Sequence, residues 1–450
     1  MKDLTKGKPS TLILAFAIPI FFANLLQLTY SIVDTRIVGS YLGENTLAAV
    51  GATTTLSNLM IGFLLGLSNG FAIITAQKFG AKDHEGVRKS FALSLKLGCV
   101  TALVITAVCL IFLKQILGFM NVSAELMKTA SSYIFIIIAG LLATFLYDAC
   151  AAALRALGDT LTPLMILLVS VCLNIAGDIL LVVVFKTGVR GAAVATVVSQ
   201  ALAFVICWIY MVRKYELLRI KFSDIMENDS DEIRQMKKNM LSAGLSMGFM
   251  SSLVNIGSLT LQTAINKLGQ DIIVAHTAAR KISEIFMIMF TVFGQTMATF
   301  CGQNIGAGEV KRVKKGIKLA IFYTCIWCTL AIIASYTISP WLVYLVTGSH
   351  NEAVIRNASN YLKFDTLFYY VTAVICVVRN AMQGLGEQIT PLVSSSLEMI
   401  GKTVIAFTLV PMLGYTGVIV AEPLVWFIMV IPLLIKIFRM PVFQENRQSL

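Results

Sequence analysis

Charged side chains are scarce in this sequence, and their scarcity limits what the protein can be. They make up 13% of the 450 residues, 57% are hydrophobic, and the mean hydropathy is +0.81. A soluble domain carries about 25% charged residues, so the composition excludes an ordinary soluble protein. It also excludes a transmembrane β-barrel, whose strands alternate in polarity over about ten residues and form no long apolar runs.

Signatures of catalysis are missing as well. The sequence has no Gly-x-x-x-x-Gly-Lys-Ser/Thr phosphate loop, so we do not expect the protein to hydrolyse ATP. It also has only three His. The single Cys-x-x-Cys pair, Cys325 and Cys328, has no His or second Cys pair beside it, which favours packing over metal binding. We therefore predict no enzyme activity and no cofactor, and a membrane-embedded enzyme is the least supported class.

The chain contains instead twelve long apolar stretches, six on each side of a polar segment at Arg213–Lys238. Roughly 20 apolar residues are enough for one transmembrane helix, which predicts an all-α membrane protein. The predicted spans are Leu12–Val38, Thr46–Lys78, Ser90–Leu117, Lys128–Ala153, Leu161–Phe185, Ala192–Val212, Asn239–Ile265, Ile272–Asn304, Gly316–Val346, Val354–Met382, Ile389–Leu413 and Thr416–Phe438.

The two halves repeat each other. "QKFGA" at Gln77–Ala81 recurs as "QNIGA" at Gln303–Ala307, 226 residues later, and "LGDTLTP" at Leu157–Pro163 recurs as "LGEQITP" at Leu385–Pro391, 228 residues later. Ordered matches at a nearly constant offset indicate a tandem duplication. The predicted domains are an N-lobe with helices 1–6 (1–212), a cytoplasmic polar hinge (213–238) and a C-lobe with helices 7–12 (239–450).

The net charge of +12 does not indicate a nucleic acid partner, because of where the basic residues lie. Lys and Arg cluster before span 1, between spans 2 and 3, in the hinge, between spans 8 and 9, and after span 12. These positions fall on one side of a twelve-span serpentine. Since cytoplasmic loops carry the excess of Lys and Arg, both termini and the hinge are predicted to be cytoplasmic.

Two predicted spans keep carboxylates inside the membrane. Span 1 carries Asp34, and span 5 carries Asp178 four residues after Asn174, on the same helix face. A carboxylate at the centre of a span costs at least about 2.5–3.5 kcal/mol on insertion scales. The acids therefore favour a functional site, with a structural hydrogen-bond network as the alternative. The neighbouring polar residues are Asn24, Gln27, Tyr30 and Ser31 on span 1 and Thr196 and Ser199 on span 6.

The second half lacks these acids. At the repeat offsets, Asp34 corresponds to Thr260 and Asp178 to Ala406. The second half has other charged residues, and the i, i+4 spacing predicts structural ion pairs. These pairs are Arg280 with Glu284 and Glu398 with Lys402. We expect Asp365 and Glu422 to be isolated and His276 to be solvated.

Together these features resemble the multidrug and toxic compound extrusion (MATE) transporters. The resemblance is carried by "VDTRIVGSYLGENTLAAVG" (Val33–Gly51), "AQKFGA" with "GQNIGA", "LRALGDTLTP" with "MQGLGEQITP", and "LNIAGD". It implies two six-helix lobes related by a pseudo-two-fold axis normal to the membrane. It also implies a monomeric antiporter of the prokaryotic inner membrane, which exports amphipathic or cationic organic compounds in exchange for H⁺ or Na⁺.

Within that family, the sequence is similar to the prokaryotic branch with a cation site in the N-lobe. This similarity implies that cations are coupled at Asp34, Asn174, Asp178 and Thr196, with Na⁺ as the only metal ion expected there. It also implies a substrate cavity lined by Asn24, Gln27 and Tyr30. Helix 1 is expected to bend at Pro19. Other branches place a glutamate on helix 7 and an acid on helix 10. Span 7 here has no carboxylate and Asp365 lies early in span 10, so the resemblance gives no support to a C-lobe cation site.

The alternative within the same superfamily is a flippase for lipid-linked oligosaccharides or lipid II. Those proteins tend to have about fourteen helices and a basic cavity for pyrophosphate. Twelve spans and paired acids argue against that alternative.

The charge distribution generates a test of orientation. In a Cys-free background, a single Cys at Asn228 in the hinge should resist an impermeant thiol reagent added to intact cells, because the hinge is predicted to be cytoplasmic. A Cys at Lys186, in a loop on the other side, should react. Labelling at Asn228 with protection at Lys186 would reverse the orientation.

Overall fold

The computed structural model describes residues 3–120, 122–221, 223–224, 230–348 and 350–444. Part of the predicted hinge, 225–229, and with it Asn228, lies outside these residues. The chain divides into a first unit, Met1–Asp3 with Ile18–Gly248, and a second unit, Leu4–Ala17 with Phe249–Leu450. The first helix and the helix that starts at Asp231 therefore each contribute residues to both units.

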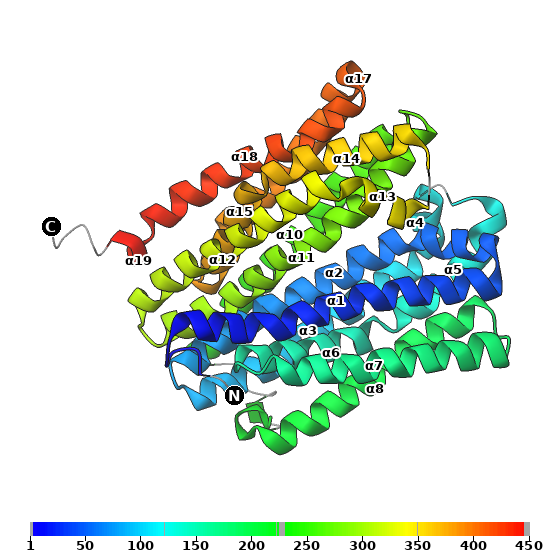
Figure 1. The fold of residues 1–450 in the computed structure, drawn as a ribbon. Coiled ribbons are helices and arrows are strands. Elements are labelled where there is room, and N and C mark those ends of the chain that lie inside the picture. The colour runs from blue at the N-terminus through cyan, green and yellow to red at the C-terminus, as the bar shows by residue number, and fades with distance from the viewer. Residues whose placement is uncertain (1–2, 121, 222, 225–229, 349, 445–450) are drawn as a thin grey trace. The chain divides into compact units, whose positions relative to one another are not determined.

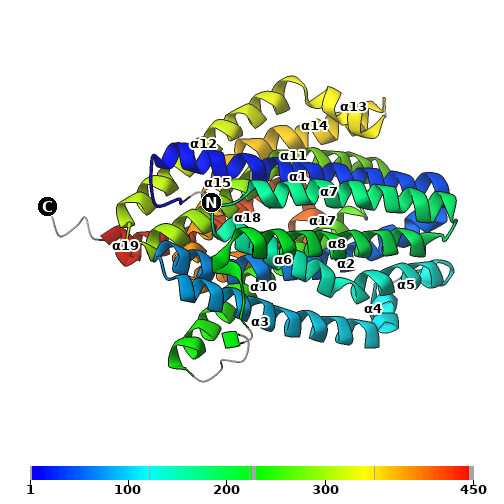
Figure 2. The same cartoon turned by 90° about the horizontal axis from the view of Figure 1, so that it is seen from below.

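Every regular element among the described residues is a helix (Figure 1). The long helices of the first unit run alongside one another, and α7 lies beside α8 in both views (Figure 2). The elements are α1 (Pro9–Leu42), α2 (Glu44–Gly80), α3 (His84–Ile111), α4 (Leu113–Phe119), α5 (Ala124–Ala139), α6 (Leu141–Ala156), α7 (Leu161–Asp178), η1 (Ile179–Val184), α8 (Val189–Lys214), η2 (Glu216–Leu218), α10 (Asp231–Ile265), α11 (Gln270–Gly306), α12 (Val310–Thr337), α13 (Ser339–Thr347), α14 (Glu352–Leu367), α15 (Tyr369–Gly384), α16 (Ile389–Phe407), α17 (Leu409–Leu413), α18 (Tyr415–Arg439) and α19 (Pro441–Gln444).

The helices correspond to the twelve predicted spans. Nine described helices are long and apolar enough to cross a membrane, and two bent pairs, α5 with α6 and α14 with α15, raise the number to eleven. The one remaining predicted span, Ile389–Leu413, is helical as α16 and α17, and Glu398 and Lys402 lower its apolar character. The prediction of an all-helical, multi-pass membrane protein is thus confirmed.

Close helix contact in the first unit depends on glycines. A Cβ atom at Gly70 of α2 would lie 2.5 Å from the carbonyl oxygen of Ala243 in α10, and one at Gly66 would lie 2.6 Å from that of Met247. Small residues allow the backbones of membrane helices to approach this closely. The first part of α10 is thereby packed on α2, and its Met236 and Met240 join the hydrophobic core of the first unit.

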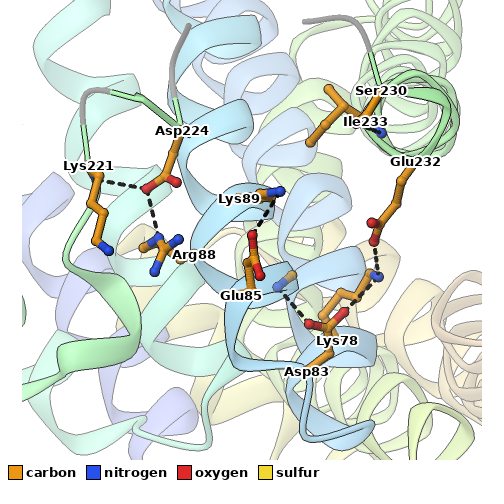
Figure 3. Close-up of polar contacts among 11 residues, drawn as sticks. Lys78, Asp83, Glu85, Arg88, Lys89, Lys221, Asp224, Ser230, Glu232 and Ile233 are labelled. Carbon is orange, nitrogen blue, oxygen red and sulfur yellow. Dashed lines mark hydrogen bonds and ion pairs between the residues drawn. The ribbon is translucent and has the colours of Figure 1, made fainter. Parts of the chain in front are cut away.

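The ends of the predicted hinge are bound to the first unit (Figure 3). The Asp224 carboxylate, with 3% of its side chain exposed, lies 2.8 Å from Arg88 Nε of α3 and accepts a 2.7 Å hydrogen bond from the Lys221 backbone N–H. Earlier in the segment Arg213 and Lys214 complete α8, and at its other end Asp231 begins α10. The described ends of the polar segment are therefore ordered by ion pairs and helices.

The two repeated Gln-containing motifs each hold the start of a long helix. Lys78 of the first motif lies 2.8 Å from Asp83 and 3.1 Å from Glu232 in the first turn of α10 (Figure 3). In the second motif, Gln303 Oε1 accepts a 3.0 Å hydrogen bond from the backbone N–H of Leu4, just before α1. The repeat thus conserves an anchoring role while it changes the chemistry of the contact.

Asp83 also caps α3. Its carboxylate accepts hydrogen bonds from Lys78 and from the Gly86 backbone N–H, each at 2.8 Å. Partial burial raises the pKa of Asp83, but these hydrogen bonds outweigh burial and hold that pKa below its ordinary value. The cap therefore stabilises the fold at neutral pH, and this contribution is lost as the pH falls through the lowered pKa.

The glycine contact generates a prediction about stability. Gly70→Val places atoms where the α10 backbone already lies, and overpacking of this kind costs about 1–3 kcal/mol. The midpoint of thermal unfolding in detergent should fall. Gly51→Ala on the same helix is the matched control, because a Cβ there meets no atom within 4 Å. Equal midpoints for the two variants would contradict this account of the α2–α10 contact.

Candidate functional site

The four residues expected to couple cations lie on three neighbouring helices of the first unit. Asp34 is on α1, Asn174 and Asp178 are on α7, and Thr196 is on α8. Asn174 is 2% exposed and Asp178 is fully buried. α7 packs along α8, because both are apolar helices joined by a short connection, and this packing brings Asn174 to Thr196.

The Asn174 amide is the centre of the hydrogen bonding. In one orientation its nitrogen donates to Thr196 Oγ1 at 3.3 Å. In the opposite orientation the nitrogen donates to Tyr30 Oη and Asp178 Oδ2, each at 3.1 Å, and the oxygen accepts from the Thr196 backbone N–H at 3.0 Å. We adopt the second orientation, because each end of the amide then has a complementary partner. Asn174 so links α1, α7 and α8.

The two carboxyl groups of the site face each other. Asp34 and Asp178 lie within hydrogen-bond range, and each has one buried oxygen, Oδ1, without a hydrogen-bond partner among the described residues. Two carboxylates this close in a medium of low dielectric repel each other strongly. A bound cation that neutralises one of them removes that repulsion, so the arrangement suits a proton or a monovalent metal ion.

Tyrosines complete the site. The Tyr30 hydroxyl hydrogen-bonds with Thr196, and Tyr133 of α5 lies close enough to Asp34 and Asp178 to interact electrostatically with both. The sequence analysis did not single out Tyr133, because an aromatic residue in an apolar helix usually packs. Tyr133 lies on the same helix face as Ile136 and is half-buried like it, and nothing in this spacing predicts a partner on α1 or α7.

Three other residues of α1 were expected to have a role: Asn24 and Gln27 in the substrate cavity and Pro19 at a bend. Asn24 is half-buried and its amide donates to the Ile20 carbonyl oxygen of its own helix at 2.8 Å, and Gln27 is exposed. Pro19 lies inside α1, which continues through it as one helix. The boundary between the two units falls between Ala17 and Ile18, next to this proline.

In the second unit, three expectations are wrong: the pairing of Arg280 with Glu284, the isolation of Glu422 and the solvation of His276. Arg280 does not pair with Glu284: its Nη1 lies 3.4 Å from Glu422 Oε1, and Glu284 pairs with Lys281 at 3.1 Å. The reason is the direction of the side chains. Glu284 faces outward with 46% of its side chain exposed, whereas Glu422 is 6% exposed and reaches Arg280 from α18.

The remaining charges of the second unit gather around Lys402. Its Nζ lies 2.9 Å from Glu398 Oε1, as predicted, and also 3.1 Å from Glu422 Oε1 and 3.3 Å from Ser258 Oγ. Glu422 is therefore not isolated. His276 is not solvated either, since it is 3% exposed.

The MatE family model matches residues 19–180 and 246–408, once in each half. The chain belongs to the MatE family. Among curated relatives of this MatE protein, the probable multidrug resistance protein YpnP of Bacillus subtilis (strain 168) is 25% identical over 391 residues, which cover 87% of this chain and 86% of YpnP. The multidrug export protein MepA of Staphylococcus aureus (strain MRSA252) is 21% identical over 408 residues, covering 90% of this chain and 88% of MepA.

A solved structure supports the same fold. A MOP superfamily transporter from Pyrococcus furiosus matches with a TM-score of 0.89 and 22% identity, over 98% of each chain. The predicted architecture of twelve helices in two lobes is thus confirmed as the fold of this MatE protein.

The hydrogen bond between Tyr30 and Thr196 generates a prediction. Thr196→Val removes the hydroxyl and preserves the shape, and a lost hydrogen bond of this kind is worth about 0.5–1.5 kcal/mol. The affinity of the purified protein for H⁺ or Na⁺, measured calorimetrically, should weaken roughly two- to tenfold. Thr101→Val on α3 is the control, since Thr101 Oγ1 donates only to the Leu97 carbonyl oxygen of its own helix. If Thr196→Val and Thr101→Val bind the cation with the same affinity, Thr196 is not part of the site.

Proposed function

We propose that the protein is a secondary active efflux antiporter, which exports amphipathic or cationic organic compounds in exchange for H⁺ or Na⁺. The observation that carries this proposal is the facing pair of carboxyl groups, Asp34 and Asp178, on membrane-spanning helices of the first unit. The names of the relatives YpnP and MepA, which describe multidrug resistance and export, support the substrate class.

The proposed mechanism follows from electrostatics. When a cation binds, the charge repulsion between Asp34 and Asp178 disappears, and Asn174 and Tyr30 are free to change partners. α1 then bends at Pro19, where its ladder of backbone hydrogen bonds is already interrupted. The bend narrows a cavity beside Asn24, Gln27 and Tyr30 and displaces the bound compound, so that ion entry and substrate exit occur in turn.

The driving force is sufficient for this task. One elementary charge that crosses 100 mV releases about 2.3 kcal/mol. Since about 1.4 kcal/mol corresponds to a tenfold concentration ratio, one proton or Na⁺ supports somewhat less than two decades of gradient for a neutral compound.

The proposal includes a location and an assembly state. The positions of the Lys and Arg clusters support cytoplasmic termini, and we propose that the protein is a monomer in the inner membrane of a prokaryotic cell. A flippase is the less favoured alternative, because two buried carboxyl groups do not suit a pyrophosphate-linked substrate.

The acid pair generates the central prediction. Asp34→Asn and Asp178→Asn should each abolish ion-driven efflux while the protein still inserts and folds, because the amide cannot take up or release a cation. Asn174→Ala should weaken coupling less, since it removes a ligand but no charge. Dye efflux from proteoliposomes, with H⁺ and Na⁺ gradients imposed separately, measures the effect and identifies the ion.

Thr260→Ala is the matched control, because Thr260 stands where the repeat places the counterpart of Asp34. It should leave efflux unchanged. Efflux at the level of the parent protein from the double variant Asp34→Asn, Asp178→Asn would refute the mechanism.

A further inference from the structure

The last spans of the two copies, α8 and α18, share two exposed residues near their ends. α8 begins at Val189 and α18 at Tyr415, 226 residues later, which is also the offset of the Gln-containing motifs. At this offset few residues are identical: Gly191, Val194, Ala195, Ile209 and Arg213 match Gly417, Val420, Ala421, Ile435 and Arg439. The Ile and the Arg of each helix are exposed. Packing inside the protein does not constrain such positions, so their identity points to a common role.

The shared residues line a groove on the surface of each unit. The α8 groove has a volume of about 520 Å³ and is lined by Ile206, Ile209, Tyr210, Arg213 and Lys214. The α18 groove has a volume of about 400 Å³, includes part of α19, and is lined by Ile435, Phe438, Arg439, Phe443 and Gln444. Ile209 and Ile435 are 45% and 49% exposed. Each groove therefore joins an apolar wall to an arginine.

Arg213 is the available cation of the α8 groove. Its guanidinium forms no ion pair or hydrogen bond with another residue that the structure describes. The neighbouring Lys214 hydrogen-bonds with the Tyr210 hydroxyl, and its Nζ lies 4.8 Å from the centre of the Tyr210 ring. Lys214 also interacts electrostatically with Asp159. The last turn of α8 thus presents the guanidinium of Arg213 to a ligand from outside the chain.

Arg439 has the same position in the α18 groove. Within the described ranges its guanidinium has no ion pair or hydrogen bond. Lys436, one turn earlier, is paired with Glu387 at 3.0 Å. A second cation comes from α12, where Lys314 Nζ lies 5.9 Å from the centre of the Phe443 ring. The α18 groove therefore offers an arginine beside aromatic rings, with a lysine near its edge.

The lengths of the two helices place these arginines at a membrane surface. α8 has 26 residues and α18 has 25, which corresponds to about 38 Å at 1.5 Å per residue. The hydrocarbon core of a bilayer is about 30 Å thick. Their last residues are therefore expected at the level of the lipid headgroups, with Ile209 and Ile435 one turn closer to the acyl chains. An even number of predicted spans separates the two helix ends, so both grooves are expected at the same leaflet.

An anionic phospholipid meets both requirements of the grooves. A guanidinium binds phosphate oxygens through parallel hydrogen bonds, and basic pockets beside membrane helices bind anionic headgroups. A free phosphate ion would leave the apolar wall uncovered, and a zwitterionic lipid would bring a cation of its own toward the arginine. Snorkelling accounts for an arginine at the end of a membrane helix. It does not account for a groove of the same composition at the counterpart position of a diverged copy.

We propose that the α8 groove and the α18 groove each bind one anionic phospholipid, whose phosphate lies on Arg213 or Arg439 and whose acyl chain lies along Ile209 or Ile435. The two sites are independent of the antiport mechanism at Asp34. Each lipid holds the last turn of its helix at the surface of the leaflet. Since α8 leads into the polar hinge, the first lipid also fixes where the hinge leaves the membrane.

Native mass spectrometry of the purified full chain counts the bound lipids. With phosphatidylglycerol, the parent protein should retain two lipids, Arg213→Gln and Arg439→Gln one each, and the double variant none. The affinity of the changed groove should fall at least about tenfold, because charged hydrogen bonds to phosphate are lost. Lys318→Gln on α12 is the matched control and should retain two lipids, because Lys318 is an exposed cation on the same predicted side of the membrane and lines neither groove.

Four outcomes would overturn the proposal. The double variant or Lys318→Gln fails to show the expected count; phosphatidylcholine with the same acyl chains is retained equally, which assigns binding to the apolar wall alone; inorganic phosphate displaces the lipid, which assigns the grooves to a free anion; or the arginine variants abolish a dimer mass, which assigns the grooves to a second copy of the chain.

Two controls separate lipid binding from folding and from transport. The double arginine variant should keep the parent's midpoint of thermal unfolding in lipid-free detergent, since both guanidinium groups are exposed. If that midpoint falls, Arg213→Lys and Arg439→Lys decide: they keep the charge but lose the paired hydrogen bonds, and should weaken lipid binding without changing the midpoint. Asp34→Asn should retain two lipids whether or not it transports, so this proposal and the proposed function can fail separately.

Discussion

A charge inside an apolar medium must be balanced by another charge or by a bound ion, and this constraint explains most polar features of the structure. In the first unit the balance is incomplete by two carboxyl groups, Asp34 and Asp178, which face each other. In the second unit Lys402 lies between Glu398 and Glu422 within 3.1 Å of both. We propose that a mobile cation balances the first arrangement, whereas the charges of the second are largely balanced by fixed side chains.

The duplication therefore preserved a scaffold and changed its interior. Both copies keep the Gln-containing motif near the start of a long helix, and both keep a broken span, α5 with α6 and α14 with α15. The two acids of the first copy have no counterpart in the second, since Asp34 corresponds to Thr260 and Asp178 to Ala406. A helix needs only its apolar surface to pack in lipid, so a few interior positions are free to change without loss of the fold.

The sequence predicted what depends on local periodicity. Apolar runs gave the spans, and the four-residue spacing of Asn174 and Asp178 placed them on one face. Partners on helices far apart in the sequence could not be predicted from this periodicity. Glu422 lies 142 residues after Arg280, and helical spacing offered Glu284 as an equally good partner. Tyr133 was missed for the same reason, since only the tertiary packing of α5, which contacts α2 and α8, brings it near the acids.

The π-helical segment η1 begins directly after Asp178. The two copies differ in length around it: Pro163 to Gly188 is a separation of 25 residues, whereas Pro391 to Gly414 is one of 23. The first copy therefore carries two additional residues in the interval that contains η1. A π-turn absorbs an inserted residue as a local bulge within a continuous helix. The acid of α7 thus stands next to the interval in which the two copies differ in length, so the exact correspondence between them is interrupted beside the site.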